Sequence, residues 1–429
     1  MRVALVNPPW RFEHSTYFGC REPHLPLELG YARALLDARG HDTLMLDGHL
    51  TGTDAATLAA EVLAFRPDMV VVTTAPSYLF WRCAQPELRV PRDMIARIRD
   101  SGAMAVAVGP HGSSTPRAAL TKLGADVVIR GECEDAVLAL AEAGSPEHVP
   151  GAAWRDMSGE IQVNGPPQAT MFVDTPPLAW PDGWIARHHH HHHRFDAAPD
   201  GPGAEVEASR GCPYACTFCA KIDFRDRYRR RRLDLLLAEI DGLLRQGVTY
   251  LYFIDEIFLP QRPLLEALRD RDVRFGVQTR IDLWKPDMLD LLGEAGCVSV
   301  EAGIESLTEE GRASLDKKCR LSTGELSALL IHARRRIPFV QANLILSATD
   351  DKDTIAAWRE GLRTEGVWAN DPVPLFPYPS SPDYRRLFGE PDEMAWERAH
   401  AHYLDRFSAF SDIQEAAPLP LPELERLAC

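Results

Sequence analysis

Three cysteines within eight residues carry the strongest chemical signal in the sequence. Cys212, Cys216 and Cys219 lie in the stretch SRGCPYACTFCAK, directly after an apolar run with the character of a strand. Thiolates prefer soft metals, and three of them in one loop can wrap a single metal centre. A structural zinc site normally has four ligands, whereas an iron–sulfur cube held by three cysteines leaves one iron open for another ligand. The spacing therefore favours a 4Fe-4S cluster over structural zinc or incidental thiols.

Six consecutive histidines, His188 to His193, form a second unusual stretch. A vector tag is normally terminal, whereas this run lies between a Pro-rich segment and the next strand-like run, so we interpret it as natural sequence. Alternate histidines of an extended chain could bind a transition metal adventitiously. We hypothesise that one or two of them line a substrate cavity, as hydrogen-bond donors or proton carriers. A solvated linker is the alternative.

Arginines dominate the stretch RDRYRRRR at residues 225 to 232. Such a run usually marks the solvated start of a helix with local salt links. The alternative is a docking surface, because arginines beside a redox centre would steer an acidic flavodoxin or ferredoxin type reductant toward it.

Length and composition limit the class of protein. The chain has 429 residues, 45% of them hydrophobic, and a formal net charge of −15. These values predict a folded, water-soluble protein of two or three domains, and the negative charge argues against nucleic acid as the main partner. No apolar stretch reaches the roughly 18 residues that span a bilayer, and the apolar run near the beginning of the sequence is too short for a signal peptide. Nine cysteines without a secretion signal indicate reduced thiols and a cytoplasmic location.

The first 140 residues alternate strand-like and helical runs. Continuous apolar strands separated by helices predict a parallel, doubly wound, Rossmann-like sheet, with strands at residues 2 to 7, 42 to 47, 68 to 74, 103 to 109 and 125 to 131. Such sheets bind ligands beyond the carboxyl ends of their strands. The residues at those ends are small or polar and suit a close-fitting cofactor: Asn7, Pro8, Pro9, Asp47, Thr73, Gly109, His111, Gly131 and Glu132. A plain flavodoxin-like scaffold with ordinary turns is the alternative.

A second alternation follows a break in the pattern. Residues 141 to 203 are rich in Pro and Gly and predict a linker that ends in the histidine run. Residues 204 to 385 predict six strands, too few for a closed eight-stranded barrel and consistent with a partial (β/α)6 barrel. The expected strands lie at 204 to 209, 249 to 255, 274 to 280, 297 to 305, 338 to 346 and 366 to 378. Residues 386 to 429 form a C-terminal tail with one amphipathic helix.

The cysteine motif after the first barrel strand, with Phe218 just before the last cysteine, resembles the radical SAM superfamily, and the N-terminal domain resembles that of its cobalamin-binding branch. Further motifs support the resemblance over residues 1 to 385: NPP, PLELGYARALLDARGH, VGPH, RGECE, FIDEIF, GIES and PYPSSPDY. The resemblance implies three cofactors, namely a 4Fe-4S cluster, S-adenosylmethionine (SAM) and cobalamin.

The same resemblance implies an enzyme that methylates an unactivated carbon of a small-molecule substrate, through a 5′-deoxyadenosyl radical and methylcobalamin. A cyclase, oxidase or rearrangement enzyme with the same cofactors is the nearby alternative. A non-catalytic cobalamin sensor or carrier would need no cluster, so the three cysteines argue against it. The resemblance assigns no catalytic residue.

The resemblance also implies which residues hold the cofactors. The three cysteines ligate the cluster, next to Phe218. Asp255 and Glu256 lie where the family holds the amino group of SAM, and Arg280 and Glu305 lie where its carboxylate and ribose hydroxyls need partners. In the N-terminal domain the strand-end residues named above contact cobalamin, Asp47 among them.

Some positions depart from the family pattern. Val108 replaces the first residue of the usual Gly-Gly turn, and the stretch LILSATDD lacks the expected glycine and proline turn, so no SAM contact is assigned to Ser347. The stretch DGHLTG fits the D-x-H-x-x-G pattern that supplies an axial histidine to cobalt in some cobalamin proteins. It follows the second strand and not the first, so we do not expect His49 to ligate cobalt.

Overall fold

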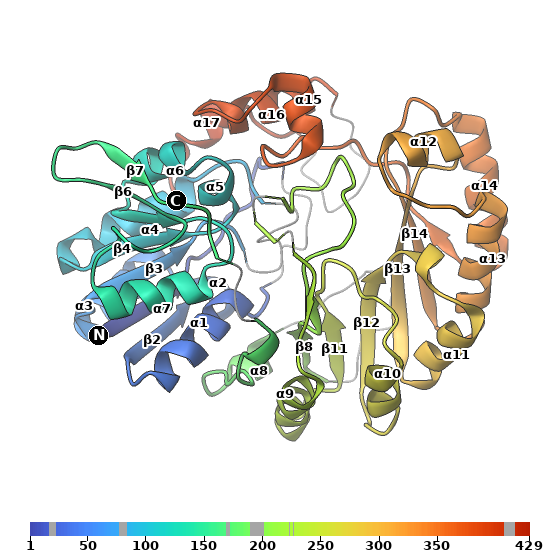
Figure 1. The fold of residues 1–429 in the computed structure, drawn as a ribbon, viewed down its shortest axis with the longest axis horizontal. Coiled ribbons are helices and arrows are strands. Elements are labelled where there is room, and N and C mark those ends of the chain that lie inside the picture. The colour runs from blue at the N-terminus through green and yellow to red at the C-terminus, as the bar shows by residue number, and fades with distance from the viewer. Residues whose placement is uncertain are drawn as a thin grey trace. The chain divides into compact units, whose positions relative to one another are not determined.

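The computed structural model describes residues 1–16, 23–76, 84–168, 172–188, 201–222, 224–225, 227–406 and 417–429 (Figure 1). The chain forms two compact units. The first comprises Met1–His188, Cys219–Arg227 and Phe376–Cys429, and the second comprises His189–Phe218 and Tyr228–Leu375. None of the helices in the described part of the chain combines the length and the apolar character that crossing a bilayer would require.

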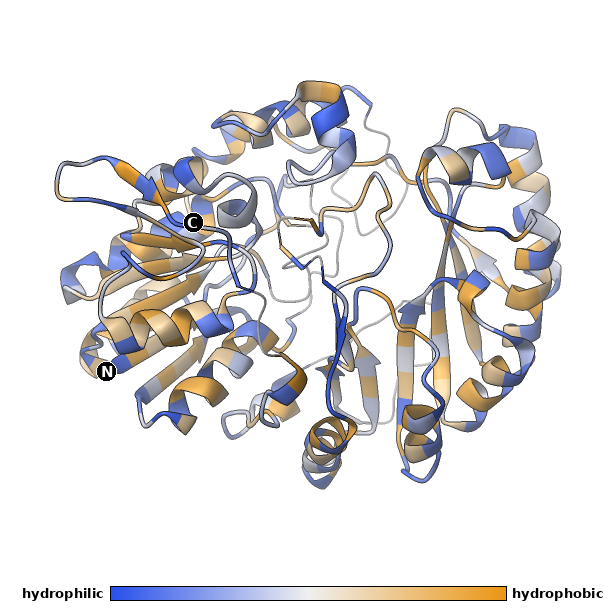
Figure 2. Ribbon diagram, viewed as in Figure 1, coloured by the Kyte–Doolittle hydropathy of each residue, from blue (hydrophilic) through white to orange (hydrophobic). Residues whose placement is uncertain are grey.

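The first unit is built on a seven-stranded sheet of order β2-β1-β3-β4-β5-β6-β7. Its strands are β1 (Arg2–Asn7), β2 (Asp42–Asp47), β3 (Met69–Thr73), β4 (Met104–Val108), β5 (Val127–Ile129), β6 (Ala152–Arg155) and β7 (Ile161–Val163). The first five are parallel, as the sequence predicts. Their apolar side chains are buried because helices cover a parallel sheet on both faces, and Figure 2 shows these strands as largely hydrophobic.

The helices of the first unit pack in pairs. Helix α1 (Leu27–Ala38) contacts α7 (Glu134–Ala143), and α3 (Ala55–Phe65) contacts α4 (Arg89–Ile98). The predicted doubly wound class is therefore confirmed.

The structure differs from the predicted linker over residues 141–203. Strands β6 and β7 form an antiparallel hairpin that extends the sheet beyond β5. Its turn is closed by the amide of Gly159, which donates to the carbonyl of Asp156 over 2.9 Å, and Gly159 adopts a φ of 88°. Strands of only four and three residues are too short to show an alternating pattern.

The C-terminal tail belongs to the first unit. It contains α15 (Pro382–Phe388), α16 (Ala395–Leu404) and α17 (Leu421–Leu424). Trp396, Ala399 and Tyr403 of α16 form one apolar cluster with Phe376 and Leu421. The unit boundary therefore lies at Phe376, before the predicted end of the barrel at residue 385.

The second unit contains the predicted partial barrel. Its sheet has six parallel strands in the order β15-β14-β13-β12-β11-β8. The strands are β8 (Gly203–Val206), β11 (Tyr250–Phe253), β12 (Arg274–Thr279), β13 (Cys297–Glu305), β14 (Phe339–Leu344) and β15 (Trp368–Ala369). The helices between them include α9 (Leu233–Arg245), α10 (Arg262–Arg269), α11 (Pro286–Glu294), α13 (Thr323–Arg334) and α14 (Lys352–Thr364).

The basic run contains a short strand and then leads into a helix. Strand β10 (Arg229–Arg230) pairs with β9 (Ser209–Arg210) in an antiparallel ladder, and α9 begins only at Leu233. The end of the run is therefore a helix start, as predicted, because Arg232 is the N-cap of α9 and its Nη2 lies 2.6 Å from Asp234 Oδ2. Arg229 and Arg230 instead pair with a strand that is distant in sequence, which the local pattern does not predict.

Candidate functional site

The cysteine loop follows β9 in the second unit. Cys212 and Cys216 are partly buried there, and Cys219 begins the short segment that packs with the first unit. Phe218, the residue directly before Cys219, is also partly buried. The amide of Thr217 donates to the carbonyl of Leu315 over 3.0 Å, which ties the loop to the segment after α12 (Glu309–Ser314).

Two predicted carboxylates hold the main chain that leads into this loop. Asp255 accepts hydrogen bonds from the amide of Ala208, over 2.9 Å, and from the Ser209 hydroxyl. Glu256 accepts from the amide of Gly211 over 2.8 Å. Burial raises the pKa of Asp255 well above its ordinary value, although both hydrogen bonds oppose the rise. Asp255 is thus a buried residue that fixes the loop, a role that the sequence did not reveal.

An ion pair that the sequence did not reveal lies directly before the loop. Arg210 Nη2 is 2.6 Å from Glu207 Oε2, and both side chains are almost completely buried. Buried ion pairs are stable only when their geometry is good, because both charges have lost their water. The pair fixes the backbone two residues before Cys212.

Arg280 lies at the end of β12 and contacts the loop. Its guanidinium carbon is 4.1 Å from the ring centroid of Tyr214, a cation–π geometry. Its Nε and Nη2 atoms contact the carboxylate of Asp282 over 3.1 and 2.7 Å. Within the described residues, Nη1 of Arg280 is buried and makes no hydrogen bond. That atom fits the predicted role of binding a carboxylate.

Glu305 forms a buried contact with Lys317, which the sequence did not single out. Lys317 Nζ is 2.7 Å from Glu305 Oε1, and Glu305 has a φ of 67° beside a bulge in β13. Burial raises the pKa of the Cys216 thiol, whereas the charges of Lys317 and Arg280 oppose the rise. The thiolate is the form that binds metal, and these two cations only partly offset the effect of burial on this thiol.

Polar side chains of three neighbouring strands interlock at the carboxyl edge of the first sheet. The amide nitrogen of Asn7 donates to Asp47 over 2.9 Å, and its amide oxygen accepts from Thr73 over 2.9 Å and from Trp10 over 2.8 Å. The register places Asn7 directly beside Asp47. Burial raises the pKa of Asp47 to about 7. Three predicted site residues therefore form one buried network.

His111 is held in the first unit by both ring nitrogens. Its Nε2 is 2.8 Å from the carbonyl of Gln85, and its Nδ1 is 3.2 Å from the hydroxyl of Thr74. Burial lowers the pKa of His111 to about 3, so the ring is neutral. Since a carbonyl only accepts, Nε2 must carry the proton. Neither nitrogen is left for a metal, and the ring also packs on Trp396 with centroids 4.4 Å apart.

The predicted turn glycines are required by close backbone approaches. Gly109 has a φ of 140°, and a Cβ there would lie 2.3 Å from the Thr74 hydroxyl. Gly131 has a φ of 70°, and a Cβ there would lie 2.9 Å from Pro167. Glycine alone tolerates both demands. The neighbouring predicted residues Pro8 and Glu132 are buried, and Pro9 is partly buried.

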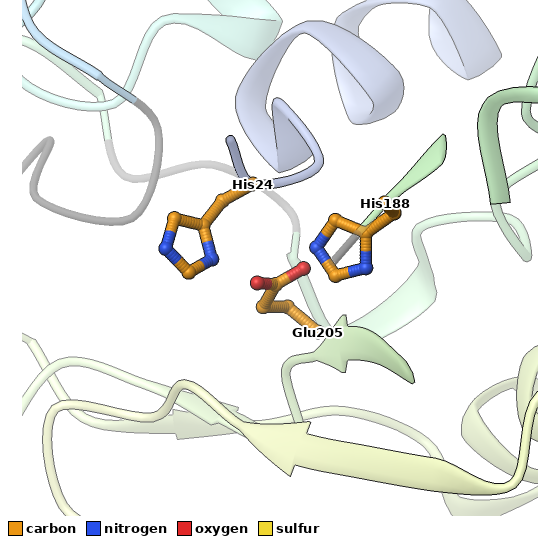
Figure 3. Close-up of side chains that lie close together, drawn as sticks. All are labelled: His24, His188 and Glu205. Atoms are coloured by element: carbon orange, nitrogen blue, oxygen red, sulfur yellow. The ribbon is translucent and has the colours of Figure 1, made fainter. Parts of the chain in front are cut away.

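The first histidine of the run is buried in the first unit. The rings of His188 and His24 have centroids 6.0 Å apart, in an edge-to-face arrangement (Figure 3). Figure 3 also draws Glu205, a buried residue of β8 in the second unit. The remaining histidines, residues 189 to 193, lie outside the described residues, so the hypothesis that the run lines a substrate cavity stays a prediction. His49 lies in α2 (Gly48–Thr51) and contacts the ring of Phe12 edge-on, with centroids 5.6 Å apart.

Models of two known families match parts of this chain. The model of the Radical SAM superfamily matches residues 206–356, and the model of the B12 binding domain matches residues 21–141.

Curated relatives share about a quarter of their residues with this chain. An uncharacterized methyltransferase of Pyrococcus horikoshii is 25% identical over 319 residues, which cover 71% of this chain and 66% of the relative. The anaerobic magnesium-protoporphyrin IX monomethyl ester cyclase of Cereibacter sphaeroides is 24% identical over 412 residues, which cover 90% of this chain and 64% of the relative. The chain thus spans slightly less than two thirds of the length of both relatives.

The fold resembles that of TsrM, a radical SAM methyltransferase from Kitasatospora setae. Its structure with cobalamin and a 4Fe-4S cluster has a TM-score of 0.69 and 20% identity, and the match covers 89% of this chain and 76% of TsrM. Its structure with tryptophan substrate and a SAM analogue has a TM-score of 0.70 and 19% identity, with coverage of 90% and 76%.

Proposed function

We propose that this chain, which carries a radical SAM domain and a B12-binding domain, is a cobalamin-dependent radical SAM enzyme that methylates an unactivated carbon of a small molecule. The observation that carries the proposal is the loop of three cysteines that follows the first strand of a six-stranded parallel sheet. A small-molecule substrate is supported by the TsrM structure with tryptophan. We also propose the cytoplasm as the location, because the cluster thiols must stay reduced.

The residues present fit a cluster and SAM. Cys212, Cys216 and Cys219 would hold the cluster, and the charges of Lys317 and Arg280 partly offset the rise that burial causes in the pKa of the Cys216 thiol. We assign the SAM carboxylate to Nη1 of Arg280. When bound, the cluster and SAM together supply a 5′-deoxyadenosyl radical that removes a hydrogen atom from the substrate.

The first unit fits cobalamin through its strand ends. The glycines Gly109 and Gly131 let the turns after β4 and β5 approach closely, and the network of Asn7, Asp47 and Thr73 fixes the ends of β1, β2 and β3. When bound there, cobalamin supplies the methyl group. His111 cannot ligate cobalt, because both of its ring nitrogens are occupied by Gln85 and Thr74.

Product analysis tests the proposal. The anaerobically reconstituted enzyme is incubated with candidate small molecules and SAM that carries a deuterated methyl group. We expect S-adenosylhomocysteine and 5′-deoxyadenosine in equal amounts, because each methylation uses one SAM for the methyl group and one for the radical. The label should appear in the product. If neither compound exceeds its level in the Cys216→Ala variant for any substrate, the proposal fails.

A radical cyclase is the second candidate, favoured by the match to the Cereibacter cyclase over 90% of this chain. Cyclisation needs no methyl transfer. It would therefore give substrate loss and 5′-deoxyadenosine without S-adenosylhomocysteine, so the same experiment separates the two functions.

We propose that a flavodoxin or ferredoxin type reductant docks beside β10. Arg230 is exposed, Arg229 is partly exposed, and both lie on the strand that pairs with β9, directly before the cysteine loop. Two other arginines of the run cannot contact the reductant, because Arg231 is buried against Glu239 and Arg225 is also buried.

Replacing Arg229 and Arg230 by glutamine should slow cluster reduction by an acidic flavodoxin about threefold to tenfold at low ionic strength, because charge steering raises the encounter rate. Reduction rates measured against salt concentration should show a weaker dependence than in the wild type. Replacement of Arg262, an exposed arginine of α10, is the matched control and should change nothing. An unchanged salt dependence in the double variant would exclude docking at β10.

A further inference from the structure

The segment that carries the third cysteine packs with the B12-binding unit. Cys219–Arg227 belongs to the first unit, although Cys212 and Cys216 belong to the second. We infer that Glu28, acting through Arg225, is a positioning residue that holds this segment and with it the proposed cluster ligand Cys219. The inference rests on the proposed binding of a cluster by the three cysteines.

A buried ion pair joins the segment to α1. Arg225 Nη2 lies 3.5 Å from Glu28 Oε1, and the side chains are only 2% and 3% exposed. Glu28 lies in the first turn of α1, where the helix dipole favours an acidic side chain. Removing this counterion from so buried an arginine would be unfavourable, because the charge has already lost its water. The pair therefore restrains the position of Arg225 tightly.

Local hydrogen bonds carry this restraint back toward Cys219. The carbonyl of Lys221 accepts from the amide of Arg225 over 2.8 Å and from the amide of Phe224 over 3.0 Å, which closes a tight turn. The guanidinium carbon of Arg225 also lies 5.3 Å from the ring centroid of Phe224. The carbonyl of Ala220, the residue after Cys219, accepts from the Ser380 hydroxyl over 3.1 Å. The turn is thus fixed at both ends.

The same turn meets the strand ends that we assign to cobalamin. Phe224 and Ala220 line a small cavity with Pro110, which directly follows Gly109, and with Trp396. The carbonyl of Phe224 would lie 3.8 Å from a Cβ at Gly131. One turn therefore links a proposed cluster ligand to the loops after β4 and β5. Such a link suits a reaction in which two cofactors must act on one substrate carbon, since small displacements of reacting groups slow catalysis severely.

The test compares holoenzymes that differ at this pair. Glu28→Gln, Arg225→Met and the double variant are loaded with cluster and cobalamin, and the rate of iron release to a chelator is measured. Each single variant should release iron about tenfold faster than the wild type, because the remaining buried charge loses this counterion and the turn shifts. The double variant should be no faster than the single ones, since both changes remove one interaction.

Two further measurements exclude a general loss of structure. The cobalamin content should match that of the wild type, and the electron paramagnetic resonance signal of the reduced cluster should broaden in Glu28→Gln. Arg225→Lys, which keeps the charge, should stay close to the wild type. The matched control is Glu425→Gln, which removes the ion pair of Glu425 with Arg92, 2.7 Å apart in the same unit; its iron release should be unchanged.

Other results overturn the inference. Wild-type iron release in Glu28→Gln would show that the pair does not hold the ligand segment, and so would fully additive effects in the double variant. If Glu28→Gln loses cobalamin together with iron, Arg225→Met decides, and slow iron release in that variant counts against the inference. A wild-type protein that binds no cluster at all would instead refute the proposed function, so the two failures are distinguishable.

Discussion

Replacement of Cys216 by alanine is expected to abolish cluster binding and reductive cleavage of SAM, while cobalamin binding by the first unit persists. Three thiolates are needed to hold the cube, and no other cysteine of the described chain lies in this loop. The charges of Lys317 and Arg280 also oppose the rise that burial causes in the pKa of the Cys216 thiol. Iron content, the absorbance of the cluster and 5′-deoxyadenosine formation should all fall to the background of iron-free protein. Cys212→Ala and Cys219→Ala should behave alike.

Two other cysteines provide matched controls. Cys297 is buried in β13, with its thiol 3.3 Å from the carbonyl of Ser299, and Cys319 lies beyond α12 with its thiol near the carbonyl of Leu321. Cys319→Ala is the sharper control, because its thiol is influenced by Arg280, which contacts Tyr214 of the loop, and by Asp282, the partner of Arg280. Both variants should keep a full cluster. If Cys297→Ala loses iron as completely as Cys216→Ala, the model of three ligands is wrong.

The sequence predicted the positions of the strands of both units well. The expected bounds of β1, β2 and β13 coincide with those in the structure, and the six strands of the second unit all exist. Apolar runs between helices predict buried parallel strands because both faces of such a sheet are covered. The spacing of the cysteines predicted a cluster because all three proposed ligands lie in one short loop, so the signal is local in the sequence.

Contacts between distant segments could not be predicted in this way. Nothing in the local pattern pairs Lys317 with Glu305 or Arg225 with Glu28, because such partners are set by the packing of elements far apart in the chain. We predicted that His111 contacts cobalamin because it lies in the turn after a strand. In the structure both of its ring nitrogens form contacts inside the first unit, with Thr74 and with Gln85. Part of the basic run became a strand for the same reason, since its partner β9 lies about twenty residues earlier.

The stability that Asp47 contributes to the first unit should fall as the pH rises from about 4 to about 7. Burial raises the pKa of Asp47 from 3.8 to about 7. Between these values the unfolded chain has lost the proton and the folded chain retains it, so rising pH favours unfolding. At about 1.4 kcal/mol for each pKa unit, ionisation of Asp47 costs the folded state about 4 kcal/mol in total. Above pH 7 both states are ionised and the effect levels off.

Comparison of the wild type with Asp47→Asn isolates this contribution from those of other buried groups. Glu87, whose pKa burial raises to about 7, adds to the trend, whereas His111, whose pKa burial lowers to about 3, opposes it. We expect the free energy of unfolding of the wild type, relative to Asp47→Asn, to fall by about 3 kcal/mol between pH 5 and pH 8. Amide hydrogen exchange of β1 and β2 in the cobalamin-free protein, corrected for intrinsic rates, measures it. Asp54, an exposed helix cap whose pKa is lowered, is the matched control, since it is ionised in both states above pH 5. Asp54→Asn should shift stability equally at the two pH values. An equal shift for Asp47→Asn as well would show that the carboxyl of Asp47 ionises normally, and that its network with Asn7 and Thr73 is charged at neutral pH.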